Sequence, residues 1–64
     1  MGIAQDKSGN VYIAAGQIYV YSKAGNLIDI IKTPERPTHL VFGGKDRRTL
    51  FILSHSSVYS IRIS

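Results

Sequence analysis

The stretch from Ile3 to Tyr21, IAQDKSGNVYIAAGQIYVY, decides the fold, because its order of strands and turns occurs a second time in the chain. The order is strand, aspartate-containing turn, strand, short turn and tyrosine-bearing strand. The stretch from Leu40 to Tyr59, LVFGGKDRRTLFILSHSSVY, repeats it at an offset of 37 to 40 residues, which is typical of a four-stranded propeller blade. The repeat pairs Ile3 with Leu40, Asp6 with Asp46, Val11-Tyr12-Ile13 with Leu50-Phe51-Ile52, and Tyr19 with Tyr59.

Short runs rich in β-branched and aromatic residues predict an all-β chain, because every ten-residue window with helical spacing contains a Gly or Pro. The central strands of both repeats are apolar on both faces, which is typical of sheets stacked between neighbouring sheets. The predicted strands are residues 3–5, 11–15, 18–22, 27–32, 38–42, 49–54 and 58–63.

Turn residues divide these strands into two sheets. Residues 6–10 contain the Asp, Gly and Asn that tight turns favour, and residues 16–17 form a two-residue hairpin connection. Two prolines make residues 33–37 an extended linker.

The sequence therefore predicts a partial β-propeller. Its complete blade is residues 1–32, and its last blade, 38–64, lacks a fourth strand. Closing a ring takes at least four blades, so we expect a part of something larger or a subunit of an assembly.

Composition limits the remaining possibilities. The 64 residues carry a formal net charge of +4 and no cysteine, so disulfides and thiolate metal sites are excluded. The basic residues are scattered, mostly in predicted turns, and the one cluster, residues 45–48, is interrupted by Asp46. The longest apolar run is far too short to span a membrane. No secretory signal is visible, so we expect no membrane association and a cytoplasmic location.

Five segments together carry a family pattern: GIAQDKSGNVYIAAG (2–16), IYVYSKAGNLI (18–28), PERPTHLVFGG (34–44), RTLFIL (48–53) and VYSIRI (58–63). They resemble the gluconolactonase and regucalcin-like (senescence marker protein) lactonase family. This resemblance implies a six-bladed propeller whose central channel holds a divalent metal, Ca²⁺ or Zn²⁺, for lactone hydrolysis. It also implies that the chain forms the C-terminal blades, with the last fourth strand taken from the N-terminal end of the propeller.

The resemblance does not extend to the residues that bind the metal. It places a metal-binding aspartate immediately before Gly2, where this chain has Met1, and a thioether is a poor ligand for hard cations. The other family ligands, a glutamate and an asparagine, lie upstream of the matching region. We therefore expect no catalytic residue, metal ligand or cofactor in this chain. His39 occupies a place where the family commonly has asparagine, and it is the one candidate for a substrate-lining residue.

The remaining polar motifs have simpler interpretations than catalysis. His39 and His55 lack the further ligands that a zinc site needs. Residues 54–57 place hydroxyls beside an imidazole, but no orienting acid is evident. Residues 43–45 lack the spacing of a phosphate-binding loop and predict a hairpin loop instead.

The aspartates of the two repeats, Asp6 and Asp46, could suggest Ca²⁺ loops. The further oxygen ligands of such loops are missing, so turn formation is the better interpretation.

The sequence leaves three hypotheses for function. The first is an enzyme part: a C-terminal fragment of a sugar-acid lactonase, inactive alone, whose partner is the remainder of the propeller. The second is structural, with several copies assembling through exposed sheet edges. The third and least favoured is a basic β module that binds single-stranded nucleic acid through its tyrosines together with Lys45, Arg47 and Arg48.

Overall fold

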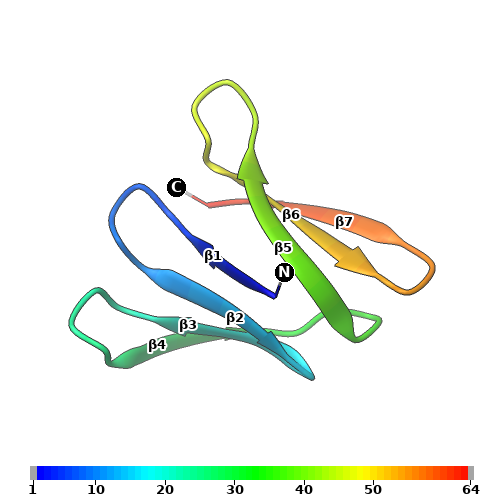
Figure 1. The fold of residues 1–64 in the computed structure, drawn as a ribbon, viewed down its shortest axis with the longest axis horizontal. Helices are drawn as coiled ribbons and strands as arrows, with labels where there is room; N and C mark the ends of the chain where they lie inside the picture. The colour runs from blue at the N-terminus through cyan, green and yellow to red at the C-terminus, as the bar shows by residue number, and fades with distance from the viewer. Residues whose placement is uncertain (1, 64) are drawn as a thin grey trace.

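The computed structural model describes residues 2–63 and arranges them in two antiparallel sheets (Figure 1). The first sheet has four strands and the second has three, each in chain order. The all-β prediction of a four-stranded sheet followed by a three-stranded sheet is confirmed. The first sheet contains β1 (Ile3–Gln5), β2 (Val11–Ala15), β3 (Gln17–Tyr21) and β4 (Leu27–Ile31); the second contains β5 (Pro37–Gly43), β6 (Thr49–Ser54) and β7 (Val58–Arg62).

Two strand starts differ from the prediction for identifiable reasons. Ala15 pairs with Gln17, so Gly16 alone turns the chain, where the sequence predicts a two-residue connection. Gly16 has a φ of 82°, a conformation that residues with a side chain rarely adopt. The second sheet starts at Pro37, one residue early, because proline is tolerated as the first residue of an edge strand.

The core lies between the two sheets. Side chains alternate between the faces of each strand, and one face of each sheet is apolar and buried against the other sheet. The rings of Tyr12 and Phe42 cross this interface edge to face, with centroids 5.1 Å apart and planes at 76°. The buried hydrophobic residues of this core are Tyr12, Ile18 and Val20 of the first sheet and Leu40, Phe42, Leu50 and Ile52 of the second.

The strand equivalences predicted from the repeat are wrong by one residue. Tyr12 is buried in the core, whereas Phe51, its predicted counterpart, is only half-buried and lies on the opposite face from Ile52. An offset of 40 residues, which aligns Asp6 with Asp46, also aligns Tyr12 with Ile52. A shift of one residue moves every side chain of a strand to the other face, so only the structure settles this register.

Both sheets keep apolar side chains on the faces that point away from the core. On the first sheet Ile3 is 55% exposed, and it lies in register with Ile13, Tyr19 and Ile30 across the four strands. On the second sheet Val58 is 68% exposed and lies beside Leu53. We call these surfaces the outer faces. Within residues 2–63, no helix has the length and apolar character needed to cross a membrane.

The core makes a direct prediction for stability. Ile18 is fully buried, and truncation of such a residue to alanine costs roughly 2 to 5 kcal/mol. A domain of this size has a total stability of only about 3 to 10 kcal/mol, so Ile18→Ala should unfold much of the population. Urea unfolding followed by circular dichroism measures the loss.

Ile30→Ala is the matched control, because Ile30 lies on the next strand but on the outer face and is 41% exposed. It should cost less than about 1 kcal/mol. Equal losses in the two variants would contradict the assignment of the core to the space between the sheets.

Candidate functional site

The turn between β1 and β2 is organised by the carboxylate of Asp6. Its Oδ1 accepts hydrogen bonds from the backbone nitrogens of Ser8 and Asn10, each at 2.9 Å. Its Oδ2 accepts from the Asn10 amide and from the Tyr12 hydroxyl, each at 3.0 Å. The ring of Tyr12 therefore stays in the core while its one polar atom finds a partner. Both carboxylate oxygens of Asp6 therefore accept hydrogen bonds within the turn, and Oδ2 also binds Tyr12 of β2.

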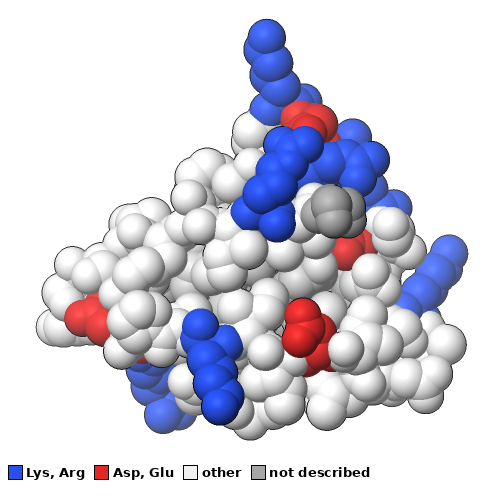
Figure 2. Space-filling view, turned by 180° about the vertical axis from the view of Figure 1, so that it is seen from behind, with Lys and Arg blue, Asp and Glu red and all other residues white. Residues whose placement is uncertain are grey.

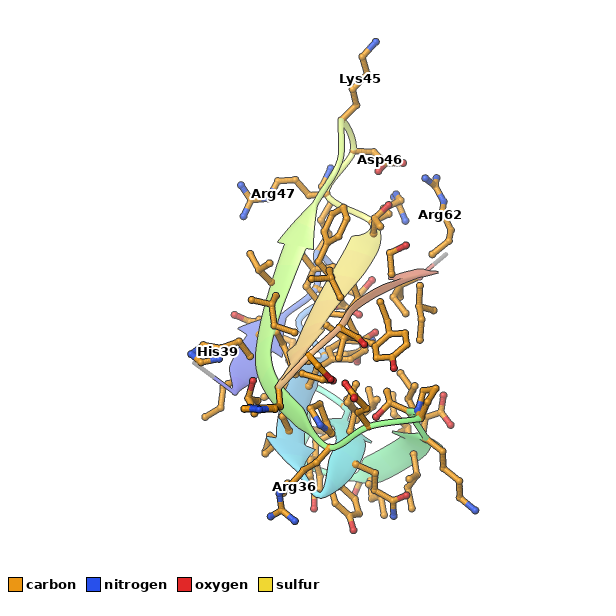
Figure 3. The ribbon with its side chains drawn as sticks, turned by 90° about the vertical axis from the view of Figure 1, so that its right-hand side faces the viewer. Arg36, His39, Lys45, Asp46, Arg47 and Arg62 are labelled. Carbon is orange, nitrogen blue, oxygen red and sulfur yellow. The ribbon has the colours of Figure 1, made fainter. Side chains whose placement is uncertain are left out.

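Asp46 has the same role in the loop between β5 and β6. Its Oδ1 accepts a hydrogen bond from the backbone nitrogen of Arg48 at 3.0 Å, and its Oδ2 forms an ion pair with Arg62 at 2.7 Å (Figure 3). In both turns one oxygen binds the backbone two residues later, and the other binds a side chain of the same sheet. The prediction that Asp6 and Asp46 are turn formers is confirmed.

These contacts change the acidity of the groups that make them. Burial alone raises the pKa of Asp6, but hydrogen bonds from Asn10, Tyr12 and Ser8 outweigh it and lower the pKa below 3.8. Burial, reinforced by the hydrogen bond to Asp6 and its charge, raises the pKa of Tyr12 from 10.0 to about 12. Across the physiological pH range, Asp6 is therefore an ionised carboxylate and Tyr12 is a neutral phenol.

In the folded chain the carboxylate of Glu35 lies at the turn between β6 and β7, although the sequence of this turn contains no acidic residue. The Ser56 hydroxyl donates a hydrogen bond to Oε2 of Glu35 at 2.6 Å, and this bond is the main cause of a lowered pKa for Glu35. The two residues are 21 positions apart, so no local pattern indicates the contact. Among residues 2–63 the ring of His55 makes no hydrogen bond, so hydroxyl, imidazole and acid do not form a catalytic relay.

His39, the predicted substrate-lining residue, lies on β5 with an exposed side chain that points away from the sheets (Figure 3). Its Nδ1 is 3.3 Å from the hydroxyl of Thr38, its neighbour in the chain. The substrate-lining role of His39 stays a prediction. Met1, the position at which the family resemblance places a metal-binding aspartate, lies outside the described residues.

The donor set of the described residues does not fit a divalent cation. Across residues 2–63, no three His, Asp or Glu side chains come together as metal ligands. The carboxylates are spread over turns and strands, and each accepts a hydrogen bond from the protein. Ca²⁺ requires about six to eight converging oxygen ligands. We therefore derive no catalytic step through a metal bound to these residues.

A groove separates β4 from β7. The two sheets pack closely through β1, β2 and β5, whereas about 460 Å³ of open volume lies between β4 and β7. Its apolar lining includes Ile28 and Ile31 on one side and Ile61 and Ile63 on the other. β7 is also the last strand of its sheet, so its outer edge has no strand partner within residues 2–63. The groove and the two outer faces are open apolar surfaces of residues 2–63.

Residues 2–56 match the family model described as SMP-30/Gluconolactonase/LRE-like region. The chain belongs to this family. The match covers the whole first sheet together with β5 and β6 of the second, and the two antiparallel sheets are consistent with blades of an SMP-30/gluconolactonase propeller. Comparison with curated proteins and with solved structures found no significant match.

The Asp6–Tyr12 hydrogen bond predicts a two-sided pH dependence of stability. Because the pKa of Asp6 is lowered in the folded chain, its contribution is present above pH 3.8 and is lost as the pH falls further. Because the pKa of Tyr12 is raised to about 12, its contribution is complete below pH 10.0 and is lost as the pH rises towards 12. Tyr12→Phe should cost about 1 to 2 kcal/mol at pH 7 and should remove the alkaline loss due to this residue.

Urea unfolding at pH 7 measures the cost of Tyr12→Phe, and the same measurement at pH 11 shows whether the alkaline loss of stability is gone. Tyrosinate absorbance identifies the residue that ionises near pH 12. Tyr19→Phe is the matched control, since the Tyr19 hydroxyl accepts only a long 3.4 Å bond from Gln17. If Tyr12→Phe kept the alkaline dependence of the original chain, the assignment to Tyr12 would be wrong.

Proposed function

We propose that this chain supplies two adjacent sheets of a sugar-acid lactonase propeller, as its C-terminal part, and does not hydrolyse lactones alone. One observation carries the proposal: both outer faces are apolar and open. Ile3 and Leu27 are half exposed on the first sheet, and Val41 and Val58 are at least half exposed on the second. A soluble pair of sheets that worked alone would be expected to face water with polar side chains.

The groove supports the same proposal. A strand added to the edge of β7 would complete its backbone hydrogen bonds and cover Ile28, Ile31 and Ile61. The four-stranded first sheet would then face a four-stranded second sheet. The family resemblance implies that the added strand comes from the N-terminal end of the propeller chain.

The donor set supports the inactivity of the isolated chain. The carboxylates of Asp6 and Asp46 hold a turn and a loop, and Met1 stands where the family resemblance places an aspartate. In the complete propeller, the divalent metal would supply an activated water or polarise the ring carbonyl. This chain would contribute the wall of the channel, including His39, and the packing surfaces for neighbouring sheets.

A lactone hydrolysis assay tests the inactivity. The purified chain with Ca²⁺, Zn²⁺ or Mn²⁺ should hydrolyse a sugar-acid lactone no faster than the metal alone, because residues 2–63 bring no set of oxygen ligands together. A complete member of the family serves as the positive control. Turnover clearly above the metal blank would overturn this part of the proposal.

A second candidate function is structural, and the same outer faces favour it. The outer face of the first sheet in one copy could pack on the outer face of the second sheet in another, as the inner faces pack within one chain. Such head-to-tail contacts form rings if the rotation closes and filaments if it does not.

This candidate predicts association that depends on concentration. Val41→Lys places a charge on the outer face of the second sheet, where Val41 is 51% exposed, and should convert assemblies to monomers. Ala24→Lys adds the same charge at an exposed turn and should leave association unchanged. Sedimentation velocity or native mass spectrometry measures both variants. A monomer at all concentrations of the original chain would exclude assembly of copies.

A further inference from the structure

Positive charge gathers at one end of the molecule, although it is scattered along the sequence. This end, which we call the basic end, carries the turns β1–β2 and β3–β4, the β5–β6 loop and the last residue of β7. It holds two carboxylates, Asp6 and Asp46, against six of the eight Lys and Arg residues. The six are Lys7, Lys23, Lys45, Arg47, Arg48 and Arg62.

The rest of the chain is neutral. Outside the turns and loop of the basic end, Lys32 and Arg36 are matched in number by Glu35 and by Asp29, which lies in the middle of β4, so these residues add no net charge. Figure 2 shows Lys and Arg gathered at its top, over the β5–β6 loop. Figure 3 shows Lys45 at one end of the molecule and Arg36 at the other.

The two sheets contribute to the basic end together. The end pairs Gln5–Val11 and Tyr21–Leu27 bring the β1–β2 and β3–β4 turns side by side, and the side chain of Lys23 lies against Gly9. Between the sheets, residues of the β1–β2 turn and of the β5–β6 loop line one hollow. Its polar lining is Asp6, Lys7, Ser8, Arg47 and Arg48.

The negative charges at this end are already engaged. Asp46 pairs with Arg62, and this is the one ion pair between side chains of residues 2–63. Asp6 accepts its hydrogen bonds from the turn and from Tyr12. Lys7, Arg47 and Arg48 border the hollow, and no carboxylate among residues 2–63 forms an ion pair with them.

The β5–β6 loop holds its arginines in a preformed arrangement. The backbone nitrogen of Arg48 is bound by Asp46, and its carbonyl accepts a hydrogen bond from the nitrogen of Ile63 at 2.7 Å. Arg47 adopts a positive φ of 58°. A loop that is fixed at its backbone loses little further conformational freedom when its side chains bind a ligand.

The residue types in these turns and the size of the hollow indicate which class of ligand the basic end can bind. Residues 6–10, 22–26 and 44–48 contain no aromatic or large aliphatic side chain. The hollow is also lined by Phe42 and Ile63, but Phe42 is only 8% exposed and Ile63 packs against the core, so the basic end offers neither an open stacking platform for bases nor an anchor for a bilayer. The hollow measures about 10 Å³, room for about one water molecule, so a ligand lies across its rim. Guanidinium groups bind phosphate with paired hydrogen bonds, and several cations together match several adjacent phosphates.

We propose that the basic end binds a ligand with consecutive phosphate groups through Lys7, Arg47 and Arg48. Such groups occur in inorganic polyphosphate and in the phosphate chain of a nucleotide. The site lies at the opposite end of the strands from Gly2 and Thr38, which neighbour each other and the predicted channel position of His39. It is therefore independent of the lactonase proposal.

Calorimetric titration of the chain with tripolyphosphate at low salt tests the site, with orthophosphate and ATP as further probes. The double variant Arg47→Gln/Arg48→Gln should weaken tripolyphosphate binding at least about tenfold. Lys32→Gln/Arg36→Gln removes the same charge from the opposite end and should change the affinity less than about threefold. Circular dichroism checks that each variant folds, and Lys7→Gln provides a second test on the other sheet.

The outcomes distinguish recognition of a phosphate chain alone from recognition of a nucleotide or of a nucleic acid. Equal affinity for ATP and tripolyphosphate supports recognition of the phosphate chain alone, and tighter ATP binding supports a nucleotide. Absence of tripolyphosphate binding at low salt, or equal weakening in the two double variants, would overturn the site. Tighter binding of a single-stranded oligonucleotide than of tripolyphosphate, at equal phosphate concentration, would replace it with a nucleic-acid surface.

Discussion

The packing of the two inner faces against each other is the constraint on which the rest of the molecule depends. Tyr12 and Phe42 meet edge to face in this layer, and Ile18, Leu50 and Ile52 are fully buried in it. Because side chains alternate along a strand, burying one face of each sheet turns the other face outward. The open apolar outer faces are therefore a direct consequence of this core. They are also the property that favours neighbouring sheets in a propeller of the SMP-30/gluconolactonase family.

The aspartates show how the same core directs polar groups. Tyr12 has its ring between the sheets, and its hydroxyl needs a partner at the end of the strand, which Asp6 provides. Asp46 holds Arg62 in the corresponding place on the second sheet. Carboxylates that secure turns in this way are not free to converge on a cation. The chain thus has two sheets that are consistent with blades of its family, while Asp6 and Asp46 stabilise the turns of those sheets.

Antiparallel sheets also determine where charge collects. Most lysines and arginines lie in turns and loops, and in these two sheets most of the turns that carry them lie at the same end of the strands. Cations as distant in the sequence as Lys7 and Arg48 consequently border one hollow. The opposite end, with Arg36 and Glu35, stays balanced. A modest net charge spread along the chain becomes a one-sided charge in the folded molecule, which gives a small domain a surface for an anionic ligand.

The sequence by itself determined the local features. Alternating apolar residues, Gly, Asn and Asp in turns, and the prolines of the linker predicted the strands to within a residue or two, and the turn roles of Asp6 and Asp46 follow from their own neighbours. Tertiary structure decided which face of each strand is buried, the Glu35–Ser56 contact across 21 residues, and the gathering of cations at one end. These features depend on register and on contacts between distant segments, which a local pattern does not encode, because a one-residue slip reverses every side chain of a strand.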